Sequence, residues 1–161
     1  MQIEEVAVAD LIPYACNART HSPAQVLQLA NSITEFGFCN PVLIDQDNGI
    51  VAGHGRVLAA RHLGWERLPC VRLAHLTDLQ RRAYVLADNR LALSATWDEA
   101  MLALELAELR EEGFDLSLSG FEEEMVERLL NGPESAAQEI DADEYEMTYR
   151  CEHCGFEFNA N

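Results

Sequence analysis

The sequence contains no lysine, and the eleven basic side chains among its 161 residues are all arginine. Arginine binds phosphate and carboxylate oxygens through paired N–H groups, although a base-composition bias of the genome produces the same pattern. The sequence also lacks any run of about 18 consecutive apolar residues, and Met1 to Glu5 show neither the basic nor the apolar region of a signal peptide. The last two absences argue against a membrane partner and predict a cytoplasmic protein.

Paired cysteines are also scarce. Cys16, Cys39 and Cys70 stand alone among apolar or small neighbours, as unpaired thiols in a reducing compartment do. Only Cys151 and Cys154 form a recognisable pair. A chain of this length buries a sizeable core without disulfides, so we expect one ordinary domain with an appendage.

Acidic residues are abundant, and they are concentrated in the C-terminal part. Residues 1–97 hold eight Arg and nine Asp or Glu, whereas residues 98–161 hold three Arg and nineteen Asp or Glu. A field of this sign repels polyanions, so we expect contact with DNA to be indirect. The acidic part is interpreted as a solvated surface, as a docking surface for a basic DNA-processing protein, or as an imitation of the charge of DNA.

Helix and strand patterns alternate over the first part of the chain. Ser22 to Gln25 combine an N-cap hydroxyl, a proline and a glutamine in the spacing that opens a helix, and Gly37 is placed to end it. Residues 41–44 and 50–52 are short apolar runs joined by Asp47-Asn48-Gly49, which predicts a β-hairpin.

The second of these strands leads directly into Gly53-His54-Gly55-Arg56, and residues 57–63 are expected to form the next helix. A strand is expected over residues 68–73, where Pro69 favours an edge position or the start of the strand.

Three further helices are expected beyond this strand. Thr77 opens the first with a capping box, and this helix is expected to end near residues 88–90 with one apolar face formed by Leu79, Ala83 and Leu86. Beyond Trp97 the pattern becomes helical and acidic, with buried positions expected at Leu102, Leu106 and Leu109. Another short helix is expected over residues 121–130.

The turn at residues 53–56 is physically suited to phosphate, because N–H groups and the helix dipole point at the same spot. The dipole contributes about 0.3 to 1 kcal/mol, whereas micromolar nucleotide affinity needs about 8 kcal/mol. Charged hydrogen bonds at about 1.5 to 3 kcal/mol each must therefore supply most of the binding. Arg19 and Arg56 are the candidates for such contacts, each through the paired N–H groups of its guanidinium. His54 is a further hydrogen-bond donor or a proton shuttle. In the alternative interpretation, Gly53 and Gly55 only make a tight turn.

Several groups of residues resemble ParB-type N-terminal domains, and they occur in the same order. These are Asn17-Ala18-Arg19, the helix segment Leu29–Gly37, Pro41-Val42, the box Gly53–Ala60 and the pair Asp88-Asn89. The resemblance covers about residues 3–95 and is similar to the subgroup found with phage and prophage DNA adenine methyltransferases. It implies a ParB/sulfiredoxin-like α/β (α+β) fold, with a small mixed sheet and a phosphate-loop helix, followed by acidic helices and a short CxxC tail.

The resemblance also implies a nucleotide site that holds CTP or ATP with Mg²⁺. Its residues are Arg19, Gly53, His54, Gly55, Arg56, Asp88 and Asn89. Asn89 is implied to contact phosphate or the metal, and Asp88 to help order the metal. The family box has two adjacent arginines where this chain has Gly55 and Arg56, so the resemblance leaves the base of the nucleotide open. His54 stands where sulfiredoxin chemistry needs a cysteine.

The resemblance leads us to expect a phage-type, nucleotide-binding accessory protein with weak CTPase or ATPase activity. It would assist DNA modification, packaging or partition, beside a methyltransferase-type or terminase-type enzyme. Two alternatives stay open: an acidic interaction module that binds no nucleotide, and a small-molecule kinase of the serine type, with Glu35 or Asp88 as its general base. We expect a ParB-like domain over residues 1–97, an acidic helical extension over 98–132, a flexible acidic linker over 133–148 and a tail over 149–161.

The tail resembles one knuckle of a zinc ribbon, with Cys151 and Cys154 as metal ligands. A closed structural zinc site takes four ligands, so a second chain completes the site, a partner protein completes it, or no metal binds.

We predict that the tail binds Zn²⁺ only within a larger assembly, because two thiolates leave a tetrahedral ion half open. Two tails, each supplying Cys151 and Cys154, would form a four-cysteine site across a homodimer axis and contribute on the order of 10 kcal/mol. Zinc content measured together with mass in solution should give one Zn²⁺ per two chains, and a chelator should dissociate the dimer. Metal-free protein, purified under reducing conditions with zinc supplied, contradicts the prediction.

Overall fold

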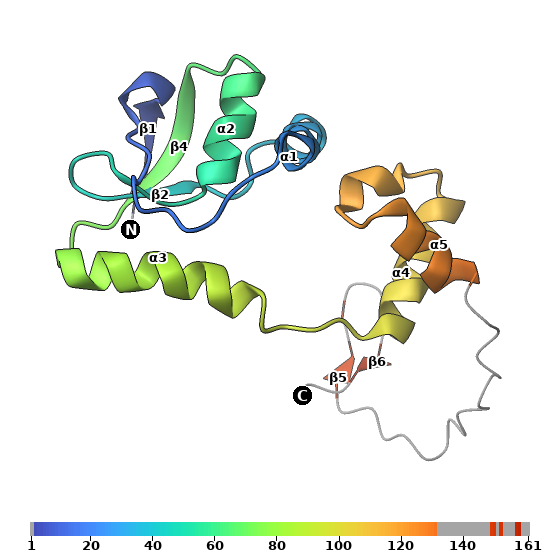
Figure 1. The fold of residues 1–161 in the computed structure, drawn as a ribbon. Helices are drawn as coiled ribbons and strands as arrows, with labels where there is room; N and C mark the ends of the chain where they lie inside the picture. The colour runs from blue at the N-terminus through green and yellow to red at the C-terminus, as the bar shows by residue number, and fades with distance from the viewer. Residues whose placement is uncertain (1, 132–148, 151, 153–156, 159–161) are drawn as a thin grey trace.

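The computed structural model describes residues 2–131, 149–150, 152 and 157–158. It shows a mixed α/β chain, which confirms the fold class expected from the sequence (Figure 1). The strands are β1 (Ile3–Ala7), β2 (Val42–Ile44), β3 (Ile50–Ala52), β4 (Arg67–Arg72), β5 (Tyr149–Arg150) and β6 (Glu157–Phe158). The helices are η1 (Val8–Asp10), α1 (Pro23–Phe36), α2 (His54–His62), α3 (Asp78–Ala92), α4 (Glu99–Glu111), η2 (Leu116–Ser119) and α5 (Glu123–Asn131).

The main sheet is mixed, with the strand order β1-β4-β2-β3. Strands β2 and β3 form the expected antiparallel hairpin, β2 runs parallel to β4, and β1 runs antiparallel to β4. The prediction that Pro69 marks an edge or a strand start was wrong, since β4 lies between two strands. The register explains how the proline fits: pairing with β2 begins only at Cys70, so Pro69 has a neighbour on the β1 side alone.

Helices cover both faces of this sheet (Figure 1). Neighbouring strand residues point to opposite faces, so Ile50 packs with Val57 of α2, whereas Val51 packs with Val85 of α3. Helix α1 lies on the outer side of α2, where Ile33 packs against Ala59. The order of layers is therefore α3, sheet, α2 and α1.

The apolar face expected on α3 does not face the core. Leu79 is 75% exposed and Leu86 is also exposed, whereas Val85 is only 3% exposed. The spacing of Leu79, Ala83 and Leu86 identifies a helix correctly, but the sheet selects the neighbouring stripe, which contains Val85. The helix therefore presents leucines to solvent.

Helices α4 and α5 pack against each other around a separate small cluster. Asp98 caps α4 through the N–H groups of Ala100 and Met101. The expected core positions Leu102 and Leu106 are buried against Val126 of α5. In Figure 1 this pair of helices lies beyond the extended segment that follows α3.

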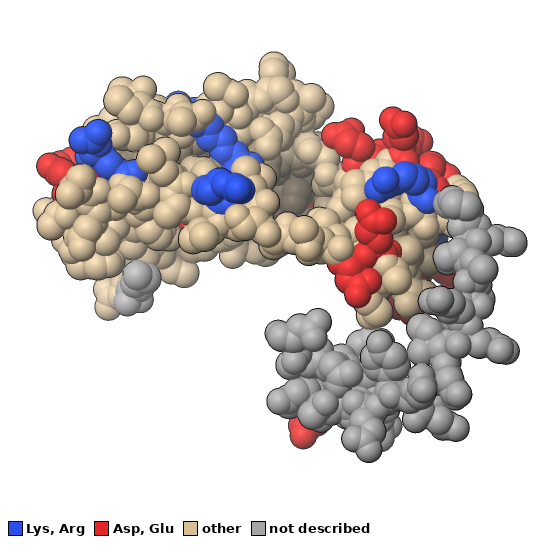
Figure 2. Space-filling model, turned by 60° about the horizontal axis from the view of Figure 1, so that its bottom comes forward, with Lys and Arg blue, Asp and Glu red and all other residues tan. Residues whose placement is uncertain are grey.

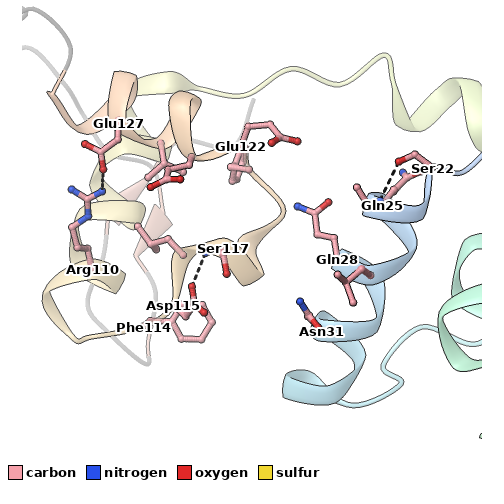
Figure 3. Close-up of a pocket in the computed structure, with 16 residues that line it drawn as sticks. Ser22, Gln25, Gln28, Asn31, Arg110, Phe114, Asp115, Ser117, Glu122 and Glu127 are labelled. Atoms are coloured by element: carbon pink, nitrogen blue, oxygen red, sulfur yellow. Dashed lines mark hydrogen bonds and ion pairs between the residues drawn. The ribbon is translucent and has the colours of Figure 1, made fainter. Parts of the chain in front are cut away.

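The α4–α5 pair meets α1 at one aromatic contact and across an open cleft. The rings of Phe36 and Phe114 stack with their centroids 6.0 Å apart. The cleft has a volume of about 740 Å³, and Figure 3 shows Gln28 and Asn31 of α1 on one wall and Glu122 on the other. Its walls combine polar side chains with apolar ones such as Leu27 and Leu116.

The described residues of the tail form two antiparallel strands, β5 and β6, with Tyr149 paired to Phe158. The predicted ligands Cys151 and Cys154 lie outside the described residues. Among the residues that are described, no helix is long and apolar enough to cross a membrane.

We predict that Leu106→Ala lowers the free energy of unfolding by about 2 to 5 kcal/mol, because the substitution leaves a cavity between α4 and α5. Leu104→Ala, on the same helix, is the matched control and should change it by less than about 0.5 kcal/mol. Leu106 is 2% exposed and Leu104 is 59% exposed. Urea denaturation followed by circular dichroism measures the free energy of unfolding of both variants. If Leu106→Ala loses no more of it than Leu104→Ala does, the prediction that Leu106 contributes packing energy to the α4–α5 cluster is wrong.

Candidate phosphate-binding site

The turn between β3 and α2 begins at Gly53, which has a left-handed backbone with φ of +99°. Side chains disfavour this conformation, which explains the glycine. Helix α2 starts at His54, about one turn earlier than the sequence predicted, so the last three motif residues form its first turn. Ser22 and Thr77 cap α1 and α3, whereas no side chain of the described part of the chain caps α2. The first N–H groups of α2 are therefore available to a ligand.

His54 is held by the loop that precedes α1. The backbone N–H of Tyr14 donates to Nε2 of His54 at 3.3 Å, so the neutral ring carries its proton on Nδ1. Burial lowers the pKa of His54, and the nearby His21 lowers it further. Both the hydrogen bond and the pKa shift favour a neutral imidazole near pH 7, which leaves Nδ1 as a hydrogen-bond donor.

Arg56 lies partly buried in the first turn of α2 without a carboxylate partner. One of its terminal nitrogens donates to the carbonyl of Pro41 at 3.2 Å, and its buried Nε has no hydrogen-bond partner in the described part of the chain. None of the ion pairs between described residues includes Arg56. Burial lowers its pKa, and the charge of Asp88 acts in the opposite direction. A desolvated guanidinium in this state favours an anion.

Arg19 and Asn89 are 70 positions apart in the sequence, and the fold brings them together. A guanidinium nitrogen of Arg19 donates to Oδ1 of Asn89 at 3.1 Å, while the amide of Asn89 donates to the carbonyl of Val85 at 2.7 Å. The side chain of Asn17 bonds the backbone of Arg19 in both directions. These residues line a pocket of about 260 Å³ with mostly apolar walls.

Asp88 lies at the exposed rim of α3. Its carboxylate accepts a long hydrogen bond of 3.5 Å from the hydroxyl of Tyr84, and burial together with this carboxylate raises the pKa of Tyr84. Asp88 lies near enough to influence Arg56, although the two form no ion pair. The pair Asp88-Asn89 lies within α3, which continues to Ala92, slightly beyond the end expected near residues 88–90.

The structure adds His21 and Tyr14 to the residues around this site. A Cβ atom built at Gly55 would lie 2.9 Å from the side chain of Leu29 and 3.0 Å from that of His21, so any larger residue there would displace these side chains. His21 thus occupies the space beside the position where the family box has an arginine. The loop has no periodic pattern, and no sequence signal indicated these two residues.

No group of three or more His, Cys, Asp or Glu that could hold a metal ion is found among the described residues. Among the predicted site residues, the structure joins Arg19 to Asn89 by a hydrogen bond and places Asp88 near enough to act on Arg56 of the turn. The two cysteines of the tail are not among the described residues.

The layered sheet and the glycine turn that opens α2 define a ParB/sulfiredoxin-like α/β domain. Residues 1–90 match the family described as the ParB N-terminal domain, and residues 100–148 match the ParB-methyltransferase HTH domain. The chain therefore belongs to the ParB N-terminal domain family.

Individual relatives agree with this assignment. The ParB-like nuclease domain-containing protein YnaK of Escherichia coli K12 is 55% identical over 73 residues, which are 45% of this chain and 84% of YnaK. The nucleoid occlusion protein of Bacillus cytotoxicus is 32% identical over 115 residues, which cover 67% of this chain but only 39% of that protein. A C-terminally truncated chromosome-partitioning protein ParB from Caulobacter crescentus, complexed with CTP-gamma-S, shares the fold. It has a TM-score of 0.66 and 23% identity, and the match covers 80% of this chain and 77% of that one.

We predict that stability falls as the pH drops through about 6.5, because the unfolded chain protonates His54 at its ordinary pKa of 6.5 while the folded chain resists the proton. His54→Gln should make this fall shallower, since an amide oxygen can accept the Tyr14 N–H and does not titrate. His62→Gln, exposed in the last turn of α2, is the control. Urea denaturation at pH 7.5 and 5.5, chosen as roughly one unit either side of that pKa, measures the slope. An unchanged slope in His54→Gln contradicts the assignment.

Proposed function

We propose that this protein is a ParB-type accessory protein that binds a nucleoside triphosphate at the start of α2. The observation that carries the proposal is Arg56, a partly buried guanidinium beside the start of α2: within the described residues its Nε has no hydrogen-bond partner, it forms no ion pair, and no side chain caps the helix. An uncompensated buried charge destabilises a fold, and bound phosphate would remove that penalty.

The residues around the turn fit a triphosphate. The N–H groups of His54, Gly55 and Arg56 would bind phosphate oxygens, and the guanidinium groups of Arg56 and Arg19 would neutralise them. The side-chain oxygens of Asp88 and Asn89 would hold a Mg²⁺ that the phosphates bring with them. The CTP-gamma-S bound to the partitioning protein of Caulobacter crescentus supports a nucleotide of this kind. CTP and ATP both remain candidates, because no contact to a base has been assigned.

The strength of the site depends on both arginines. Two charged contacts, three N–H groups and the helix dipole contribute roughly 5 to 11 kcal/mol before the cost of association. Micromolar affinity requires about 8 kcal/mol net of that cost, and the loss of either arginine removes about 1.5 to 3 kcal/mol, which weakens binding at least about tenfold.

The biological role we propose is to assist DNA modification, packaging or partition, with weak CTPase or ATPase activity. The match of residues 100–148 to the ParB-methyltransferase HTH domain supports a methyltransferase-type partner, with a terminase-type enzyme as the alternative, in a phage context. The relatives that act in nucleoid occlusion support a partition-type role on DNA. The acidic charge beyond residue 97 supports contact with DNA through the partner enzyme.

We also propose the division of the chain into residues 1–97, 98–132, 133–148 and 149–161. The separate core between α4 and α5 supports the boundary near residue 98. The antiparallel strands β5 and β6 flank the CxxC segment in the sequence, which supports a zinc knuckle with Cys151 and Cys154 as ligands and a homodimer as its completed form.

The kinase alternative has less support. Glu35 lies in the last turn of α1, six residues beyond Leu29, which is about 9 Å along the helix from the contact with Gly55. Asp88 is closer, but it lies at the exposed rim of α3.

We predict that the chain binds one of CTP, ATP or GTP with Mg²⁺, and that Arg56→Ala and Arg19→Ala each weaken binding at least about tenfold, because each removes a charged hydrogen bond to phosphate. Isothermal titration measures the affinities. Arg67→Ala, at the exposed start of β4, is the control and should bind as the unaltered chain does. Thermal melting checks the fold of Arg56→Ala, since Arg56 also bonds the carbonyl of Pro41. Equal affinity in all variants, or no binding by the unaltered chain, overturns the proposal.

A further inference from the structure

Helix α4 carries apolar residues on two sides, and only one side has a partner among the described residues. Leu102 and Leu106 are buried against α5. Met101 and Leu104, three positions apart, lie next to each other on another side of the helix, and Trp97 directly precedes the N-cap residue Asp98. We refer to Trp97, Met101 and Leu104 as the apolar row. All three are exposed, with Trp97 65% exposed. Soluble proteins seldom leave such a row uncovered unless it binds something.

The apolar row lines neither of the two cavities described above. The open cleft beside α1 is lined by neither Trp97, Met101 nor Leu104, and the pocket beside Arg19 is lined by none of them. One edge of the Trp97 ring contacts Phe121 at a centroid distance of 5.3 Å, which holds the ring in place while most of it stays exposed. The row is therefore an ordered surface, separate from the phosphate-binding site.

Acidic side chains surround this row. Glu108 continues it one turn further along α4, and Glu105 lies beside Leu104. Residues 98–131 contain eleven Asp or Glu and two Arg, a net charge of −9. The two arginines are already engaged, Arg110 with Glu127 and Arg128 with Glu99. Figure 2 shows acidic side chains gathered on this helical part of the molecule and few on the α/β part.

The charge decides which occupant fits. A second copy would bring the same net charge of −9 against this face, and residues 132–161 of the chain itself carry eight Asp or Glu and one Arg, a net charge of −7. DNA and anionic lipids are repelled as well. A basic amphipathic helix offers leucines for the apolar row and lysine or arginine for the acidic border.

We propose that the apolar row, formed by Trp97 just before α4 and by Met101 and Leu104 in its first half, is with its acidic border a docking surface for a basic amphipathic helix of a partner protein. Apolar contact with the row provides the affinity, and the surrounding carboxylates select for basic partners and reject acidic ones. The surface requires no nucleotide, so it operates whether or not the phosphate-binding site is filled.

Fluorescence of Trp97 tests the proposal directly, in a full-length Trp65→Phe background that leaves Trp97 as the single tryptophan. The probe is a designed helical peptide with leucines at helical spacing and lysines elsewhere, and its counterpart has glutamate in place of each lysine. The lysine peptide should shift the emission to shorter wavelength with saturation, and added salt should weaken its binding. The glutamate peptide should leave the emission unchanged. Equal binding of both peptides, or no binding of the lysine peptide, overturns the proposal.

Matched double variants distinguish binding at this surface from nonspecific apolar binding elsewhere on the protein. Met101→Ser combined with Leu104→Ser should weaken binding of the lysine peptide at least tenfold. Leu79→Ser combined with Leu86→Ser, on the exposed face of α3, should not change it. These α4 substitutions should also leave nucleotide affinity unchanged, so failure of the nucleotide proposal is distinguishable from failure of this one. Equal effects of the two double variants overturn the proposal. So does self-association of the chain that the α4 substitutions abolish, since the occupant would then be a second copy.

Discussion

The backbone turn at Gly53 is the constraint on which the rest of the structure depends. Its positive φ lets the chain leave β3 and enter α2 without an intervening loop. Because α2 starts at once, Val57 reaches the sheet and Ala59 reaches α1 within the next two turns. The same turn leaves the first N–H groups of α2 uncapped beside Arg56. One glycine conformation thus sets both the central layer of the fold and the place of the candidate site.

The two arginines of the candidate site differ from the ion-paired arginines of the chain. Arg19 and Arg56 have no carboxylate partner among the described residues, whereas arginines elsewhere pair with Asp or Glu: Arg72 and Arg81 in the α/β part, and Arg110 and Arg128 in the acidic helices. Unpaired guanidinium groups attract anions, and an excess of carboxylates attracts cations. The candidate site is therefore suited to phosphate and the acidic helices to a basic protein, which is a physical basis for the proposed adaptor between a nucleotide and an enzyme that acts on DNA.

Local signals predicted much of the fold, but not the packing. The cap at Ser22, the turn at Asn48-Gly49 and the burial of Leu102 and Leu106 on α4 were confirmed because each depends on a few neighbouring residues, whereas Leu109 is only partly buried. Strand β1 went unpredicted, since its sequence has no clear alternation. The buried face of α3 was predicted wrongly because leucines at helical spacing identify a helix without showing which neighbour it meets.

The sequence by itself determined the family, the hairpin and the motif at residues 53–56, because these features are written in contiguous residues whose conformations are set by short-range sterics and hydrogen bonds. Only the tertiary structure decided that Arg19 meets Asn89, that His21 closes over Gly55, and that α4 keeps one apolar row exposed. Such contacts join residues that are distant along the chain, and they depend on how whole layers pack. A local pattern does not contain that information.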